Sequence, residues 1–167
     1  MINSNTKAQI DSFVKRMKES KKVVHSNLGK AIYAACNNVE NTAKIGMTNT
    51  VLDTMKGYKI GGRVKKGRLV GYKVHYASAE GQYPAVDTGR LRQSITHDVR
   101  ESGIFNSVIG RVGSPLLYGL YLEKGTSKMK PRPWLYPSVA KNREKNEAII
   151  RQAIKGRPIN INQEQID

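Results

Sequence analysis

Acidic residues are scarce in this chain of 167 residues, in which 13 Asp and Glu stand against 29 Lys and Arg and leave a formal net charge of +16. Such an excess indicates an anionic partner or a place in a crowded assembly. Hydrophobic residues still make up 38% of the chain, which is enough to form a packed core. The length predicts a single domain over 1–156, followed by a flexible C-terminal tail over 157–167.

Cysteine is nearly absent, and the histidines are few. The single Cys36 excludes an intrachain disulfide or a cysteine-rich zinc site, and its small apolar neighbours predict a buried, unreactive side chain. His25, His75 and His97 lack any metal-binding spacing. No run approaches the roughly 18 apolar residues of a membrane-spanning helix, and the first residues do not follow a signal-peptide pattern. We therefore expect no metal, no cofactor and no membrane contact, and a soluble chain that is intracellular at synthesis.

Apolar residues at helical spacing predict a long N-terminal helical region. The stripe starts at Ile10, weakens at the basic cluster around Lys21 and resumes from Val24 to Met55. This favours a short leading helix followed by a longer one from about Lys21, with Gly57 as the stop signal.

The second half of the chain predicts strands and two more helices. Segments 95–100 and 105–112 read as antiparallel strands joined by a tight turn at 101–103. The apolar face of Leu117, Leu120 and Tyr121 predicts a helix ended by Gly125, and Pro137 suits the first turn of a last helix. The predicted fold class is α+β, with an antiparallel sheet packed against a long N-terminal helix and a C-terminal helix, and with a basic β-hairpin extension.

The predicted hairpin at 58–76 concentrates the excess charge, because the segment from Lys56 to Tyr76 contains no Asp or Glu. Its cations could follow a phosphate backbone while its tyrosines stack on bases. Equally, the tyrosines could cover the core beneath a solvated surface hairpin. The residues proposed to contact DNA or a partner are Lys59, Arg63, Lys65, Lys66, Arg68 and Lys73.

Catalytic motifs are not convincing in this chain. Asp87, Thr88 and Gly89 match the tripeptide of retroviral-type aspartic proteases, but the arginines that follow would hold the carboxylate ionised, and a cap on a short helix is the favoured interpretation. A hydrolase that uses Asp87 stays a third possibility. Phosphate-loop and Gly-x-Ser-x-Gly patterns are absent, so we assign no catalytic residue and expect no enzyme.

Three blocks in the second half carry a family resemblance. They read PAVDTGRLRQSI from Pro84, YGLYLEKGTSKM from Tyr118 and RPWLYP from Arg132. In this order and spacing they resemble the tail-completion, or head-to-tail joining, family of tailed bacteriophages. The resemblance covers about a third of the chain, from 83 to 139. The chain departs from the family pattern at two positions. Lys124 stands where the family usually has an aromatic residue, and Trp134 stands where it usually has Phe.

The resemblance implies a structural virion protein. It implies a homo-oligomeric ring, expected to be a hexamer, in the neck or tail of the virion, assembled in the host cytoplasm. Its partners would be the tail tube protein, head connector or adaptor proteins and, as a hypothesis, DNA in the lumen. The residues assigned to subunit or partner interfaces are Asp87, Thr88, Arg90, Arg92, Glu123, Thr126, Arg132 and Trp134.

Local roles for these residues follow from their types. We expect Asp87 and Thr88 to cap a short helix, and Arg90 and Arg92 to face outward while Leu91 and Ile95 pack on the sheet.

The carboxylate of Glu123 is expected to pair with Arg90, Arg92 or Arg132 of the same chain or of a neighbour. Trp134 is expected to form a rigid apolar plug in an interface or against the core.

The runner-up function is a stand-alone nucleic-acid-binding protein, for which affinity would fall steeply with salt.

Overall fold

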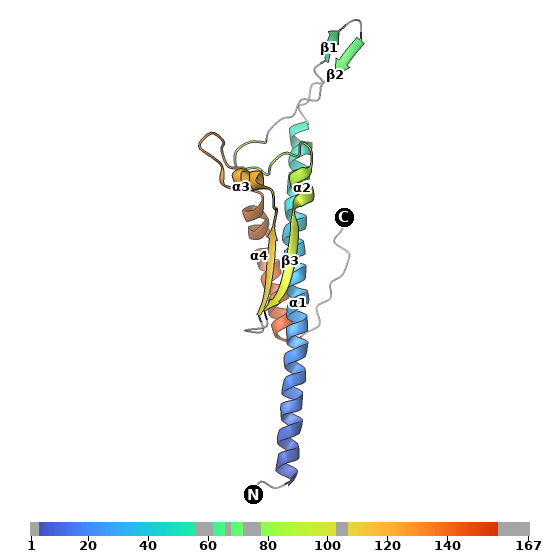
Figure 1. Ribbon diagram of the computed structural model, residues 1–167, viewed down its shortest axis with the longest axis vertical. Helices are drawn as coiled ribbons and strands as arrows, with labels where there is room; N and C mark the ends of the chain where they lie inside the picture. Colours follow the sequence, from blue (N-terminus) through green and yellow to red (C-terminus); the bar gives the residue numbers. More distant parts are fainter. Residues whose placement is uncertain (1–3, 56–61, 66–67, 72–77, 103–106, 157–167) are drawn as a thin grey trace. The chain divides into compact units, whose positions relative to one another are not determined.

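The protein is described by a computed structural model that covers residues 4–55, 62–65, 68–71, 78–102 and 107–156 (Figure 1). It confirms the predicted α+β class, with a long N-terminal helix, a C-terminal helix and a two-stranded antiparallel sheet that packs against helices. The elements, in chain order, are α1 (Ser4–Met55), β1 (Gly62–Lys65), β2 (Arg68–Gly71), α2 (Arg90–Ser94), β3 (Thr96–Ser102), β4 (Ser107–Gly113), α3 (Leu117–Lys124) and α4 (Leu135–Ile154).

Contacts within the chain gather into two compact units. Unit 1 comprises Met1–Asn38, Asp98–Arg111 and Asn142–Asp167, and unit 2 comprises Val39–His97 and Val112–Lys141. Helices α1 and α4 and strands β3 and β4 each contribute to both units. Among the helices of the described residues, none is long and apolar enough to cross a membrane.

Helix α1 is a single helix of 52 residues, so the predicted break near Lys21 is wrong. Lysine and glutamate are good helix formers, and the first glycine after Ser4 is Gly29, so nothing in the sequence interrupts the hydrogen bonding there. The apolar stripe weakens because residues 7–22 are exposed along their whole length. The predicted stop signal Gly57 lies outside the described residues.

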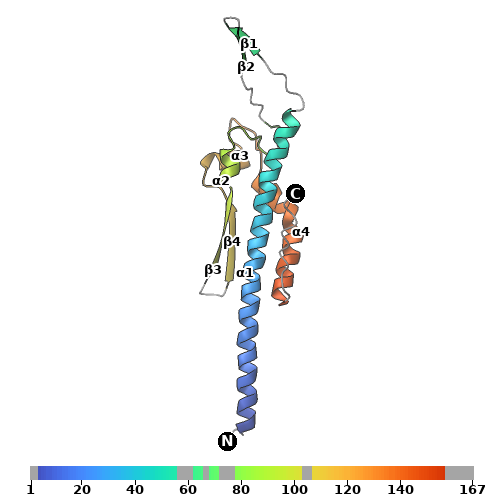
Figure 2. The same cartoon turned by 90° about the vertical axis from the view of Figure 1, so that its right-hand side faces the viewer.

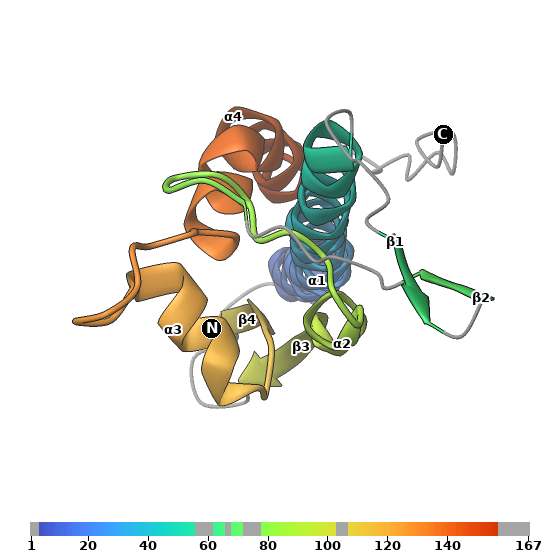
Figure 3. The same cartoon turned by 90° about the horizontal axis from the view of Figure 1, so that it is seen from above.

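The buried side of α1 is made of small residues. Ala31, Ala35, Cys36, Val39 and Ala43 are at most 9% exposed and follow one helical face. Short side chains allow neighbouring elements to approach the helix closely. Within unit 1, Figures 2 and 3 show β3, β4 and α4 beside α1.

In unit 1, α4 is joined to α1 by amide side chains. Asn146 Nδ2 donates to the Ala35 carbonyl at 3.3 Å, and Asn38 Nδ2 donates to Asn146 Oδ1 at 3.0 Å. Asn142 Nδ2 donates to the Asn38 carbonyl at 3.4 Å. Pro137 occupies the third residue of α4, as its predicted place in the first turn requires.

Strands β3 and β4 form a two-stranded sheet. Strand β3 continues through Glu101 and Ser102, where the sequence predicted a turn. At this end of β3, Glu101 Oε2 lies 3.3 Å from His25 Nε2 of α1. Residues 103–106 lie outside the described part of the chain.

Helix α3 forms and ends before Gly125 as predicted, with Gly125 at φ 74°, and the apolar face that predicted it is exposed. Leu117, Leu120 and Tyr121 are 64%, 47% and 46% exposed. The side that faces the core is that of the buried Gly119, since a Cβ there would lie 2.9 Å from Leu91 Cδ1. The helix therefore faces the core with Gly119 and Leu122, while Leu117, Leu120 and Tyr121 lie on its exposed side.

The core of unit 2 lies between α1, α2, α3 and the start of α4. Its buried residues are Ala43, Met47, Leu91, Ile95 and Trp134, and the partly buried residues packed against them are Tyr83, Val86, Val112, Leu122 and Leu135. The expected burial of Leu91 and Ile95 is thus confirmed.

Strands β1 and β2 pair antiparallel, which confirms the central part of the predicted basic hairpin. Arg63 pairs with Val70, Val64 with Leu69 and Lys65 with Arg68. Part of the predicted hairpin lies outside the described residues. This part includes the predicted contact residues Lys59, Lys66 and Lys73 and the tyrosines Tyr58, Tyr72 and Tyr76.

Replacing Gly110 tests the close approach of strand β4 to helix α1. A Cβ on Gly110 would clash with Cys36 Sγ and lie 2.6 Å from Ile32 Cγ2. We expect Gly110→Ala to lower the free energy of unfolding by about 1–3 kcal/mol. Gly113→Ala in the same strand meets nothing within 4 Å and should be neutral or slightly stabilising. Urea unfolding of both variants checks this, and equal effects would contradict it.

Candidate interaction site

Glu123, at the end of α3, joins the second and third sequence blocks. Its Oε2 accepts hydrogen bonds from the backbone N–H groups of Trp134 at 2.7 Å and Leu135 at 2.8 Å, and its Oε1 accepts one from Tyr136 N–H at 2.8 Å. A carboxylate is well suited to the N-terminus of a helix, where N–H groups lack intrahelical partners. The expected pairing of Glu123 with an arginine of the same chain is therefore wrong, because both oxygens bind the first turn of α4.

Trp134 joins the same two blocks from the core side. It is 4% exposed, and its Nε1 donates to the Gly119 carbonyl at 2.9 Å. Its carbonyl accepts from Ser138 Oγ at 2.6 Å, and Ser138 Oγ also lies 3.1 Å from Tyr83 Oη. Of the two roles expected for Trp134, the structure places it in the core of its own chain.

The first block reaches this core through Leu91 of α2. Gly89, at φ 78°, is the residue before the helix and has no side chain with which to cap it. The N–H of Arg90, the first residue of α2, instead donates to Thr88 Oγ1 at 3.5 Å, which agrees with the capping role expected of Thr88. The αL conformation of Gly89, which favours glycine, turns the chain into α2 and leaves Asp87 and Thr88 on the surface.

The three arginines of the blocks differ in their surroundings. Arg90 is exposed, as expected. Arg92 is only half-buried, and its Nη1 donates to Thr48 Oγ1 of α1 at 3.0 Å, so it does not simply face outward. Arg132 Nε donates to the Ser78 carbonyl at 2.7 Å. Among the described residues, no ion pair joins any of these arginines to a carboxylate.

A pocket of about 470 Å³ lies beside these arginines within unit 2. Its described lining includes one carboxylate, that of Asp87, and three guanidinium groups. The lining residues are Met47, Ser78, Pro84, Ala85, Val86, Asp87, Thr88, Gly89, Arg90, Leu91, Arg92, Tyr118, Leu122 and Arg132. Aspartic hydrolysis needs two carboxylates that share a proton, and a second one is absent from this described lining. The pocket is suited to binding an anionic group.

Thr126 lies in a short turn after α3. Its backbone N–H donates to the Met129 carbonyl at 2.8 Å, and its Oγ1 accepts from Lys128 N–H at 3.3 Å. The Leu122 carbonyl accepts from Arg132 N–H at 2.7 Å, so the chain after this turn returns alongside the end of α3. Thr126 is exposed, and the structure does not bring it into the pocket lining.

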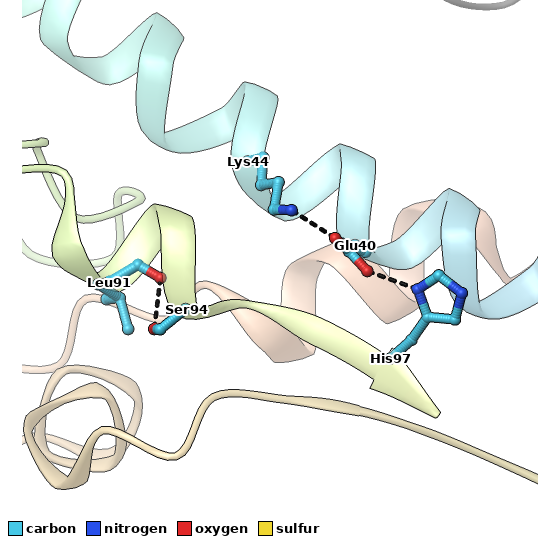
Figure 4. A network of polar contacts seen from close by, with 5 residues as sticks. All are labelled: Glu40, Lys44, Leu91, Ser94 and His97. Atoms are coloured by element: carbon cyan, nitrogen blue, oxygen red, sulfur yellow. Dashed lines mark hydrogen bonds and ion pairs between the residues drawn. The ribbon is translucent and has the colours of Figure 1, made fainter. Parts of the chain in front are cut away.

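A partly buried polar cluster between α1 and β3 was not predicted from the sequence (Figure 4). Glu40 pairs with Lys44 one turn later, and its Oε2 lies 2.5 Å from His97 Nδ1 of β3. Burial alone raises the pKa of Glu40, but the hydrogen bonds and charges of Lys44 and His97 outweigh it and hold the pKa below its ordinary value. The Glu–Lys spacing of four residues was visible in the sequence, whereas the histidine comes from a distant strand.

Other reactive groups in the described residues are not arranged for chemistry. Cys36 is buried, as predicted, and its burial raises the pKa of the thiol. No described group of three or more His, Cys, Asp or Glu side chains could hold a metal ion.

Comparisons with known proteins do not add to these observations: no protein-family model matches the chain, and neither a curated protein nor a solved structure matches it significantly.

Replacement of Glu123 tests the contact between α3 and α4. Glu123→Ala leaves three N–H groups without their acceptor and should lower the free energy of unfolding by about 2–3 kcal/mol. Glu147→Ala removes only exposed pairs with Arg143 and Arg151 and should cost less than about 1 kcal/mol. Chemical unfolding measures both, and equal losses would contradict the assigned role.

The Glu40 cluster predicts a dependence of stability on pH. Because its pKa is lowered by folding, Glu40 stabilises the protein above the ordinary glutamate pKa of about 4.3, and this contribution is lost as the pH falls through the folded value. Glu40→Gln should therefore lower the free energy of unfolding near neutral pH and reduce its loss on acidification. The control Glu80→Gln alters an exposed pair with Lys130. Urea titrations from about pH 7 to about pH 3 check this, and an unchanged pH profile for Glu40→Gln would exclude it.

Proposed function

We propose that this chain is a structural protein of tailed-bacteriophage particles that forms a ring at the junction of head and tail. The observation that carries the proposal is the mutual packing of the three sequence blocks that resemble the tail-completion family. The three blocks meet in one core. It contains Leu91 from the first block and Trp134 from the third, and Gly119 and Glu123 from the second block contact these residues. This supports a scaffold role for the blocks, because their residues hold the fold together instead of forming a catalytic centre.

Exposed apolar residues on α3 support an assembly role. Leu117, Tyr118, Leu120 and Tyr121 are each more than 40% exposed on a helix of eight residues. Exposed apolar side chains that gather on one element are typical of protein–protein interfaces. In the proposed ring, α3 would contact a neighbouring subunit.

The first part of α1 supports the same conclusion independently. Ile10, Phe13, Val14 and Met17 follow one helical face at exposures from 42% to 58%. A helical segment that buries nothing gains little stability from its own sequence, so a partner is expected to cover this face. Basic residues outnumber acidic ones in this segment, which favours an acidic partner surface. The acidic residues are Asp11 and Glu19, and the basic residues are Lys7, Lys15, Arg16, Lys18, Lys21 and Lys22.

In this proposal the chain acts by assembling into the phage particle and not by catalysing a reaction. A ring closes through heterologous contacts, in which one surface of each copy meets a different surface of the next. On this proposal the tail tube protein and a head connector protein bind the two faces of the ring. The hairpin at 58–76 would contact a neighbouring subunit, another ring or DNA in the lumen.

Loss of the chain during phage growth tests the proposal. Electron microscopy of particles made without it should show unjoined heads and tails, or tails of abnormal length. Supplying the wild-type chain or Gln152→Lys, on an exposed position of α4, should restore joined particles. Leu117→Lys, which places the same extra charge on α3, should not restore them although its free energy of unfolding is unchanged. Infectious particles formed without the chain would refute the proposal.

The nucleic-acid-binding alternative rests on the net charge of +16. It requires tight binding of free duplex DNA with an affinity that falls steeply as salt increases. Weak, non-specific binding at physiological salt would agree with the assembly role. Fluorescence anisotropy with a labelled duplex separates the two.

A further inference from the structure

The pocket in unit 2 contains polar groups that have no hydrogen-bond or ion-pair partner among the described residues. Ser78 is 2% exposed, and its Oγ has no hydrogen-bond partner among the described residues. Burying a hydroxyl without a partner costs about 1–3 kcal/mol, so such a group in a pocket lining indicates a missing acceptor or donor. The side chain of Arg90 likewise makes no ion pair with a described carboxylate, and Arg132 uses only Nε, toward Ser78 O.

The charge of the described lining selects an anion as the missing group. Arg90, Arg92 and Arg132 supply three positive charges, and Asp87 supplies one negative charge. Guanidinium groups bind carboxylates and phosphates through paired N–H donors. A serine hydroxyl can donate to the same anion.

The apolar part of the lining favours a carboxylate over a phosphate of nucleic acid. Met47, Leu91 and Leu122 line the same pocket, and Met47 is only 1% exposed. A nucleic-acid backbone has no aliphatic side chain to place against this apolar lining. An acidic side chain on a peptide with a neighbouring aliphatic residue provides both an anion and an apolar group.

One segment of this chain has that composition. Residues 158–167 read PININQEQID and contain Glu164 and Asp167 with no Lys or Arg. Ile161 and Ile166 lie close to these acids in the sequence. The segment lies outside the described residues, and it is free of the positive charge that dominates the rest of the chain.

We propose that the pocket formed by Ser78, Arg90, Arg92 and Arg132 binds a carboxylate of residues 158–167 from a second copy of the chain. The arginines bind the carboxylate of Glu164 or Asp167, and the aliphatic lining receives an adjacent isoleucine. The inference deepens the proposed function, since it names a contact through which copies would join. It concerns two copies in solution and does not depend on the identity of the tail or head proteins.

A synthetic peptide tests the site directly. The recipient is the full chain carrying Glu164→Gln and Asp167→Asn, so that its own tail does not compete. Isothermal titration with the 158–167 peptide should show saturable binding, and the same peptide carrying Glu164→Gln and Asp167→Asn should bind at least about tenfold more weakly. Adding Arg90→Gln to the recipient should weaken binding at least about tenfold, because Arg90 is exposed and makes no described side-chain bond that supports the fold. Adding Arg111→Gln, an exposed arginine of β4 outside the pocket lining, should leave it unchanged.

The oligomeric state shows whether the segment 158–167 that occupies the pocket comes from a second copy or from the same chain. Light scattering should show that Glu164→Gln/Asp167→Asn shifts the full chain toward smaller species. An unchanged oligomeric state would refute the second-copy source. Absence of peptide binding, or peptide binding that Arg90→Gln and Arg132→Gln leave intact, would refute the site. Tight binding of a DNA duplex that Arg90→Gln abolishes, without peptide binding, would assign the pocket to phosphate and overturn the proposal. Rings seen by electron microscopy in any of these cases would leave the proposed function standing.

Discussion

The arrangement of unit 2 depends on one carboxylate, that of Glu123. The segment before α4 contains Pro131 and Pro133, and no Ser, Thr, Asp or Asn stands just before Leu135 to cap the helix. The first N–H groups of α4 would therefore lack a local acceptor. Glu123 provides one from the end of α3, 11 to 13 residues earlier in the chain. Because this contact and the Trp134–Gly119 hydrogen bond fix α3 and the start of α4 together, the surfaces that α3 and the pocket present follow from them.

Small residues set the second constraint, which acts along α1. Most residues that the helix buries are small, and β4 places Gly110 where a Cβ would clash with Ile32 and Cys36. Backbone and helix can then approach without large side chains between them. In the core of unit 2, the large residues Met47, Ile95 and Trp134 are at most 4% exposed. Other large apolar residues, such as Leu117 and Phe13, lie on the surface instead.

Sequence periodicity predicted the elements well and their contacts less well. The strands, the last helix and the basic hairpin follow from local patterns, and so does the burial of Leu91 and Ile95. The predicted break in α1 failed because a weak apolar stripe near Lys21 reflects the lack of a partner within the chain, and helix propensity is retained there. Periodicity also did not indicate which side of α3 faces the core, because the helix packs there through Gly119 and Leu122. The roles of Glu123 and His97 depend on residues far away in the sequence, which no local pattern reports.

The net charge of +16 makes self-assembly a problem that the chain has to solve. Copies that carry this charge repel one another, and salt screens that repulsion only beyond about 8–10 Å. Close contact between copies therefore requires either apolar burial large enough to outweigh the repulsion or carboxylates placed opposite the cations. The exposed residues of α3 and of the first part of α1 offer the former. The pocket offers the latter, because its arginines have no carboxylate partner among the described residues and lie beside a buried serine hydroxyl without a described partner. The charge excess and the assembly role are therefore compatible if copies or partners use either of these two surfaces.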